Sequence, residues 1–166
     1  MDGILGRIVA VILGLLAMAG VGVLAYKAFS TDKNGGVTTD ITQVITNARA
    51  QFSQNNNGYT NFTTANVGAM DTAGIFPKSM VRGGVVLDRW GNQVQFASLN
   101  SATQGQITFG GGGSENAEAC TAVVTSLKDY VSLQVGGSTF DQTNQPDAVT
   151  GGQACANSLT LTLTFQ

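Results

Sequence analysis

The feature that most constrains this chain is a long segment without charge near its start. No charged residue occurs between Ile8 and Tyr26. As a helix, this run measures about 28 Å, which is close to the thickness of the hydrocarbon core of a bilayer. It is longer than the apolar part of a secretory signal, and no clean small-residue cleavage site follows it. The sequence therefore predicts a helix that can span a membrane, followed by a much more polar remainder.

Three glycines, Gly14, Gly20 and Gly22, interrupt this apolar run, with alanines between them. Small residues let helices approach one another closely in lipid or in a bundle, while each glycine weakens a helix by about 1 kcal/mol relative to alanine. A plain membrane anchor needs neither property. We therefore expect a helix that first spans a membrane and later packs into a protein assembly, with local flexibility at these glycines.

A second helical pattern follows the apolar run. The sequence Asn34-Gly35-Gly36 predicts a break or kink, with Gly35 and Gly36 as flexible points. Between Val37 and Phe52 apolar residues then recur three and four positions apart, which indicates an amphipathic helix. We expect Thr38 or Thr39 to cap its start, and the run "NNNG" to end it.

These patterns divide the chain into two parts. Residues 1–54 are predicted to form the N-terminal helix, in which residues 1–26 are the membrane or filament-core segment and the break lies near 34–36. Residues 55–166 are predicted to form a globular head. Three short strands are expected there in "GVVLD", "NQVQFAS" and "GQITFGG", with "RWGNQ" as a tight turn that carries Trp90 as an apolar anchor.

The second half of the head begins with a helix that we expect to start at Ser114 as its N-cap. A strand in "VSLQVGG" and a loop in "GGSTFDQTNQPDAVTGGQ" follow. The last segment, "SLTLTLTFQ", alternates leucine with threonine, which predicts a strand with one buried face, either inside the sheet or at its edge. The fold class is therefore α+β, with an antiparallel sheet packed on the C-terminal half of a long helix.

The composition excludes several classes of function. The chain has no histidine, which removes the commonest general base and metal ligand. The four glycines from Gly110 to Gly113 lack the Lys-Ser/Thr pair of a phosphate-binding loop, and Asp88 and Asp141 are expected to be turn acids rather than calcium ligands. The net charge is −2 and no basic stripe occurs, which argues against a nucleic-acid partner. We expect no enzyme activity, no metal and no cofactor.

The chain has two cysteines, Cys120 and Cys155. In an oxidising compartment they predict one disulfide, which would close a loop of about 34 residues and tie the second helix to the final strand. Two buried free thiols are the alternative. The Thr-, Ser-, Asn-, Gln- and Gly-rich remainder is typical of a domain exposed outside a cell.

A long helix that is apolar and then amphipathic, an antiparallel sheet and a C-terminal cysteine pair together resemble the type IV pilins. The run Ile8–Tyr26, the stretch "RWGNQVQF" and the Cys120 and Cys155 pair carry the resemblance, which extends over essentially the whole chain. It is strongest to the type IVb group, and within it to the PilS-type pilins of conjugative thin pili and enteric pili.

The resemblance implies a processed N-terminus at Met1, usually methylated after a prepilin peptidase removes a leader. It also implies subunits that wait in the bacterial inner membrane. An assembly ATPase and a platform protein then build them into an extracellular helical filament, with the apolar helices bundled in its core. Partners would be copies of the chain itself, the assembly machinery, and recipient cells or phage.

One position departs from the family pattern. Most type IV pilins have glutamate at the fifth mature position, where it is thought to neutralise a neighbour's N-terminal amine, whereas this chain has Leu5. A charged amine buried in a dry bundle is costly unless it is paired. Asp2 could therefore compensate the amine of Met1, with Arg7 completing a small charge network. Alternatively, Asp2 and Arg7 simply mark the membrane interface.

The sequence thus predicts the major pilin of a type IVb pilus, used for conjugation or adhesion. A minor pilin or pseudopilin that primes a filament is the first alternative. A membrane-anchored extracytoplasmic binding domain that never polymerises is the second.

Overall fold

The computed structural model describes residues 31–166, and residues 33–166 form one compact unit. The first described element of the chain is a long helix over residues 31–52. The apolar stripe predicted from the spacing is buried, because the side chains of Val37, Ile41, Val44, Ile45 and Ala48 are at most 4% exposed. The turns around Asn55 end this helix, as predicted.

The predicted break at Asn34-Gly35-Gly36 is wrong, because the helix runs through these residues without interruption. Tertiary contacts override the low helix propensity of glycine here. The Trp90 indole Nε1–H donates to the Asn34 side-chain oxygen at 3.2 Å, and Val37 is almost fully buried. Thr38 and Thr39 lie inside the helix instead of capping it, and their hydroxyls donate to the carbonyls of Asn34 and Gly35.

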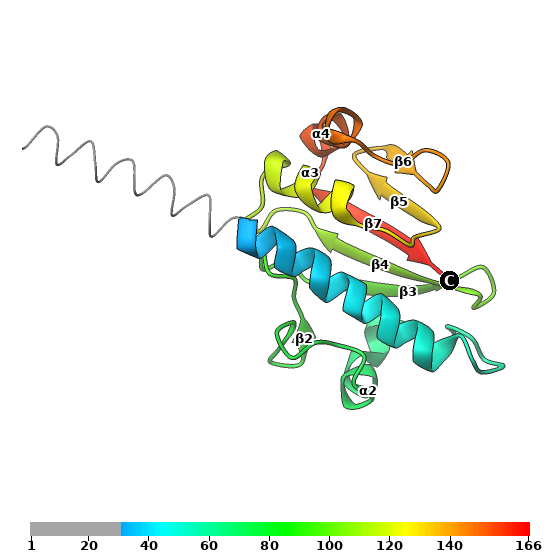
Figure 1. The fold of residues 1–166 in the computed structure, drawn as a ribbon. Helices are drawn as coiled ribbons and strands as arrows, with labels where there is room; N and C mark the ends of the chain where they lie inside the picture. The colour runs from blue at the N-terminus through cyan, green and yellow to red at the C-terminus, as the bar shows by residue number, and fades with distance from the viewer. Residues whose placement is uncertain (1–30) are drawn as a thin grey trace, which may run out of the picture. The chain divides into compact units, whose positions relative to one another are not determined.

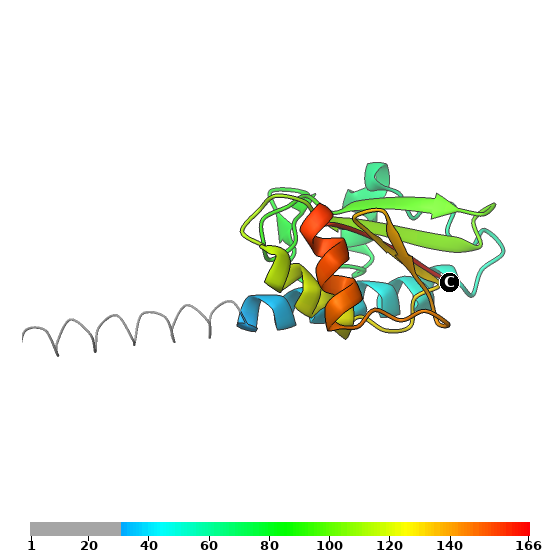
Figure 2. The ribbon, with the colours of Figure 1, turned by 90° about the horizontal axis from the view of Figure 1, so that it is seen from above.

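The sheet has five strands in the order β3-β4-β7-β5-β6, and every neighbouring pair is antiparallel. The strands are β3 (Gln95–Leu99), β4 (Gln104–Gly110), β5 (Ser132–Val135), β6 (Ser138–Phe140) and β7 (Thr160–Phe165). The alternating last segment therefore lies at the centre of the sheet. In Figures 1 and 2 the long helix and α3 (Ala117–Ser126) cover the same face of the sheet.

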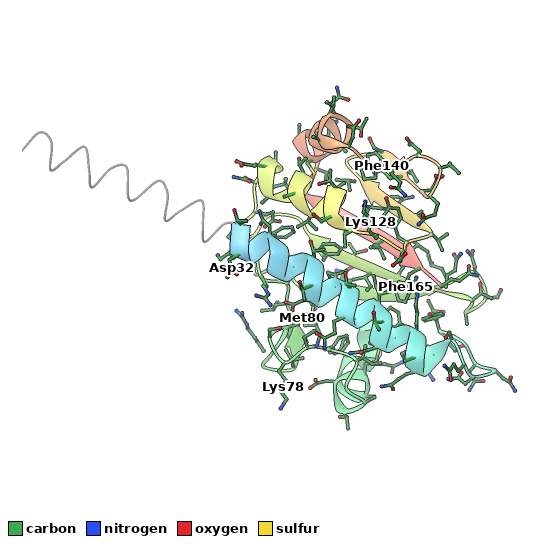
Figure 3. All side chains as sticks on the ribbon, viewed as in Figure 1. Asp32, Lys78, Met80, Lys128, Phe140 and Phe165 are labelled. Carbon is green, nitrogen blue, oxygen red and sulfur yellow. A yellow bond between two sulfur atoms is a disulfide. The ribbon has the colours of Figure 1, made fainter. Side chains whose placement is uncertain are left out.

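A smaller part of the head connects the long helix to the sheet. It contains η1 (Thr64–Asn66), α2 (Val67–Thr72) and a two-stranded ribbon of β1 (Val81–Arg82) and β2 (Val85–Val86). Met80 and Phe165, labelled in Figure 3, are almost fully buried in the core that the long helix shares with the sheet and this connection.

A further helix, α4 (Ala148–Asn157), occupies part of the segment that the sequence predicted as a loop, and β6 occupies another part. The helix forms because Asp147 and Thr150 make a capping box at its start. The helix α3 begins two residues later than predicted, since Asn116 rather than Ser114 caps it.

Candidate interaction site

The head holds the first turns of the long helix through side chains around the turn at residues 88–92. We call Asp40, Asp88, Arg89, Asn92 and Glu115 together the junction cluster. Its first component is an ion pair between Arg89 and Asp40. The Arg89 Nε–H donates to Asp40 Oδ2 at 2.7 Å and an Nη2–H donates to Oδ1 at 3.1 Å. This two-point pairing fixes both distance and orientation. The Ser79 hydroxyl also donates to Asp40, whose side chain is only 6% exposed.

Gly36 leaves room for the Arg89 side chain in this ion pair. A Cβ at Gly36 would overlap the guanidinium of Arg89, whereas a Cβ at Gly35 would meet nothing within 4 Å. The helix therefore approaches the arginine closely at one glycine and not at the other. Gly36 is thus a residue of close approach, which is a different role from the flexible point that the sequence predicted for it.

The second component of the junction cluster is a pair of buried carboxylates, Asp88 and Glu115, 3% and 8% exposed. Asp88 accepts hydrogen bonds from the backbone N–H groups of Trp90, Asn92 and Gly110 at 2.8–2.9 Å. The Asn92 side-chain amide bridges the two acids, donating to Asp88 at 3.1 Å and to Glu115 at 3.1 Å. Asp88 is therefore a turn acid, as predicted.

Glu115 organises the glycine run that the sequence treated as a flexible loop. Its Oε1 accepts the backbone N–H groups of Gly111 and Gly112 at 2.6 and 2.8 Å. Burial alone would raise the pKa of Glu115, but these N–H groups, its own backbone N–H and the Asn92 amide together hold that pKa below its ordinary value. The loop is thus ordered around an ionised carboxylate.

Polar side chains along the long helix also hold the segments on either side of it. The Arg49 guanidinium donates to the backbone carbonyls of Gln166 and Asp129 at 2.8 and 2.6 Å, and it lies over the ring of Phe165 at 5.8 Å. The Asn47 amide donates to the carbonyls of Gly74 and Ile75 after α2. The helix is therefore an integral part of the head.

The predicted disulfide is present between Cys120 and Cys155, whose Cα atoms are 5.9 Å apart. It joins α3 to α4, and not α3 to the final strand as predicted, because Cys155 lies within α4. Gly151 of α4 faces α3, where a Cβ would make ordinary van der Waals contact with Val124 and Thr125. Closing a loop of this length stabilises a fold by about 3–4 kcal/mol in loop-entropy models.

Within residues 31–166 no group of three or more acidic, cysteine or histidine side chains could hold a metal ion. None of the helices in this part of the chain has the length and apolar character needed to cross a membrane. Asp141 is a turn acid, as predicted, and accepts the backbone N–H groups of Thr143 and Asn144.

Several predicted site residues lie outside the described residues: Met1, Asp2, Leu5, Arg7, Gly14, Gly20 and Gly22. Sequence analysis missed the ion pair of Arg89 with Asp40 and the bridge from Asp88 through Asn92 to Glu115. A partial signal existed for the turn, because Asp88 followed by Gly91 fits the first and last positions of a β-turn. Nothing local in the sequence pairs residues as far apart as Asp40 and Arg89.

The described residues have the type IV pilin fold: a long helix packed on an antiparallel sheet, with a disulfide near the C-terminal part. One solved structure with this arrangement is a type IV b pilin from Salmonella typhi, with a TM-score of 0.59 and 19% sequence identity. The match covers 80% of this chain and 97% of that one. No protein-family model matches the sequence, and no curated protein matches it either.

Proposed function

We propose that this chain is a pilin, a structural subunit that polymerises into a type IVb pilus. The observation that carries the proposal is the arrangement of the head, which matches nearly the whole length of a type IV b pilin. The sequence adds the uncharged run Ile8–Tyr26 immediately before the described helix. Such a run suits a subunit stored in a membrane before it enters a bundle of neighbouring helices.

The way the head holds its helix also supports a structural role. Force along a filament would pass between the helix and the head, and the Arg89 pair with Asp40 and the Arg49 contacts lie across that boundary. A subunit under tension needs such cross-links. An anchored binding domain needs only a tether.

The finer features of the proposal concern residues 1–30. Subunits are held in the bacterial inner membrane, matured at Met1 by a prepilin peptidase with methylation, and extracted by the assembly machinery. Gly14, Gly20 and Gly22 allow local unwinding of the helix in the filament. The pilus serves conjugation or adhesion, and its partners outside the cell are recipient cells or phage.

The direct experiment is to shear surface filaments from cells that make the chain and to analyse them by electron microscopy and mass spectrometry. We expect thin filaments in which this chain is the main protein and begins at a methylated Met1. A minor pilin or pseudopilin would be a trace component of filaments made of another subunit. Retention of all the chain in the membrane fraction would favour an anchored domain and overturn the proposal.

A second experiment addresses the charge pairing proposed for the amine of Met1. We expect Asp2→Ala to reduce pilus yield while the protein still inserts into the membrane, and Asp2→Glu to restore part of the yield, because a carboxylate is retained. A normal yield from Asp2→Ala would show that Asp2 and Arg7 only mark the membrane interface. The proposal for the filament itself would survive that result.

A further inference from the structure

The end of the head at which the long helix stops contains an open cavity of about 430 Å³. The turn after the long helix, the β3–β4 loop and Gln166 after β7 form its walls. Figure 1 shows these three segments together at the end of the molecule marked by the C-terminus. They come from well-separated parts of the sequence, so the cavity is a product of the fold. We call it the end cavity.

The side chains that line the end cavity are amides and hydroxyls, and none of them is charged. Three of them, Asn56, Asn57 and Ser101, are exposed, and their side chains form no hydrogen bond within residues 31–166. Buried carboxylates such as Asp88 and Glu115 hold the fold, whereas these three exposed side chains remain available to a ligand.

The backbone of one wall is strained. Asn100, Ser101 and Ala102 have φ angles of 51°, 54° and 68°, so three consecutive residues other than glycine are left-handed. This conformation costs an L-residue roughly 1–2 kcal/mol and normally occurs at single positions. Strain of this kind persists only where the surroundings impose it, and it concentrates at functional sites.

The two main walls are locked to each other by Tyr59. Its backbone N–H donates to the carbonyl of Ala102 at 2.7 Å. Gly58, with a φ of 49°, allows this approach, since a Cβ there would overlap the same carbonyl. The cavity is therefore preformed, and a ligand would meet walls that need little reordering.

Tyr59 is one of the residues around the cavity; its side chain is 2% exposed, and its hydroxyl is buried with no hydrogen-bond partner in the described residues. An unsatisfied buried hydroxyl costs about 1–3 kcal/mol. The ring of Tyr59 packs edge-on against those of Phe62 and Phe165, with centroid distances of 6.0 and 5.4 Å. Phenylalanine at this position would keep both contacts without the cost of the buried hydroxyl. The unpaired hydroxyl and the left-handed turn thus belong to residues that border the same cavity.

We propose that the end cavity binds a neutral carbohydrate. Its volume lies within the range of small-molecule sites, about 300–1,000 Å³. Sugar hydroxyls both donate and accept hydrogen bonds, which suits amide and hydroxyl partners, whereas an anion or a cation would find no oppositely charged side chain on the lining. The proposal does not depend on filament formation, because the cavity lies within one head.

A second neutral hollow on the open face of the sheet serves as an internal comparison. It measures about 300 Å³ and is lined by residues that include Gln134, Thr139 and Thr162. Of the non-glycine residues that line it, none has a left-handed backbone or an unpaired buried hydroxyl. The arguments from backbone strain and from an unpaired buried hydroxyl therefore do not apply to this hollow.

The test is saturation-transfer NMR with the full chain in detergent. The probes are lactose, mannobiose, N-acetyllactosamine and chitobiose, with 3′-sialyllactose as an anionic probe. We expect transfer to at least one neutral sugar. The variant Asn56→Ala/Asn57→Ala removes two free amides without removing a side-chain hydrogen bond of the fold. It should keep the unfolding midpoint and weaken binding roughly tenfold or more, whereas Thr139→Ala on the sheet face should leave binding unchanged.

A second variant, in the β3–β4 loop, tests whether sugar binding depends on the fixed shape of the cavity. Ala102→Gly relieves left-handed strain, so it should raise the unfolding midpoint while it weakens sugar binding, because the loop loses its fixed shape. The proposal is overturned if no neutral sugar receives saturation, if only the sialylated probe does, or if the Asn56→Ala/Asn57→Ala variant binds as tightly as the wild type.

Discussion

The two ends of the head differ in whether their polar groups have hydrogen-bond partners. In the junction cluster, the buried carboxylates Asp40, Asp88 and Glu115 accept hydrogen bonds from an arginine, a serine, an asparagine and five backbone N–H groups outside Glu115 itself. At the end cavity, exposed amides lack partners, a tyrosine hydroxyl is buried without one, and the backbone is left-handed over three residues. Charged side chains are concentrated at the first end and are absent from the lining of the second.

This difference indicates that the two ends serve different purposes. A buried charge is tolerated only when it is paired and hydrogen-bonded, so the junction cluster is a structural device whose disruption costs stability. Strain and unsatisfied groups lower stability, so their presence at the end cavity points to a use other than folding. Substitutions at the junction cluster should therefore destabilise the head, whereas selected substitutions at the end cavity should stabilise it.

The largest effect is expected from Arg89→Ala. It leaves the almost fully buried Asp40 with only the Ser79 hydroxyl among the side-chain partners described above. We expect a loss of about 2 kcal/mol in the free energy of unfolding, less than for a completely buried pair because Arg89 is partly exposed. Urea unfolding followed by circular dichroism measures it. Arg82→Ala, at an exposed arginine, should change stability by less than about 0.5 kcal/mol, and an equal effect of both variants would contradict the role of the pair.

Alanine substitution at the two glycines near the start of the long helix should change the free energy of unfolding in opposite directions. Gly35→Ala should stabilise the head by about 0.5–1 kcal/mol, because alanine is the better helix former and a Cβ there meets nothing. Gly36→Ala should destabilise it by about 1 kcal/mol, because its Cβ displaces the Arg89 guanidinium.

A double-mutant cycle sharpens this comparison. In an Arg89→Ala background the obstacle to a Cβ at residue 36 is gone, so Gly36→Ala should become neutral or stabilising in urea unfolding. If Gly36→Ala costs the same in both backgrounds, the close approach to Arg89 is not the reason for the glycine.

At the opposite end, Ala102→Gly should stabilise the head by about 0.5–1 kcal/mol. Relief of left-handed strain, roughly 1–2 kcal/mol, is partly offset by the greater freedom of glycine in the unfolded chain. Ala156→Gly, at an exposed position of α4, should instead lose about 1 kcal/mol of stability. Destabilisation by both glycines would remove the evidence for strain in the β3–β4 loop.

The smallest effect is expected in the pH dependence of Glu115. Because its pKa in the folded head lies below the ordinary value of 4.5, the ionised group contributes stability above that pH. This contribution is lost as the pH falls through the lowered pKa. The wild type should therefore lose free energy of unfolding more steeply than Glu115→Gln between about pH 5 and pH 3. Identical slopes in a urea series across this range would show that the hydrogen bonds from Gly111 and Gly112 do not favour the ionised form.

Much of the architecture followed from periodicity. The alternation of leucine and threonine before Phe165 predicted a strand with one buried face, and the spacing from Val37 to Phe52 predicted the buried stripe of the long helix. These signals are strong because each repeats over several residues against one core. The pairing of the cysteines also followed from their number.

The missed elements depend on contacts that are remote in sequence. Two glycines lower the helix propensity of α4, and its helix forms because of the Asp147 capping box and the disulfide to α3. The glycines at 35 and 36 suggested a break that packing against Trp90 and Arg89 overrides. The end cavity has no local signature, because its walls meet only in the folded chain.

The most direct test of the central claim is a cryo-electron microscopy map of filaments sheared from cells that make this chain. The account predicts that the head of residues 33–166 fits the density of every subunit in the filament. In that density the long helix should be continuous through Gly35 and Gly36, and the disulfide should join α3 to α4. Filaments built from a different protein, with this chain found only in the membrane fraction, would contradict it.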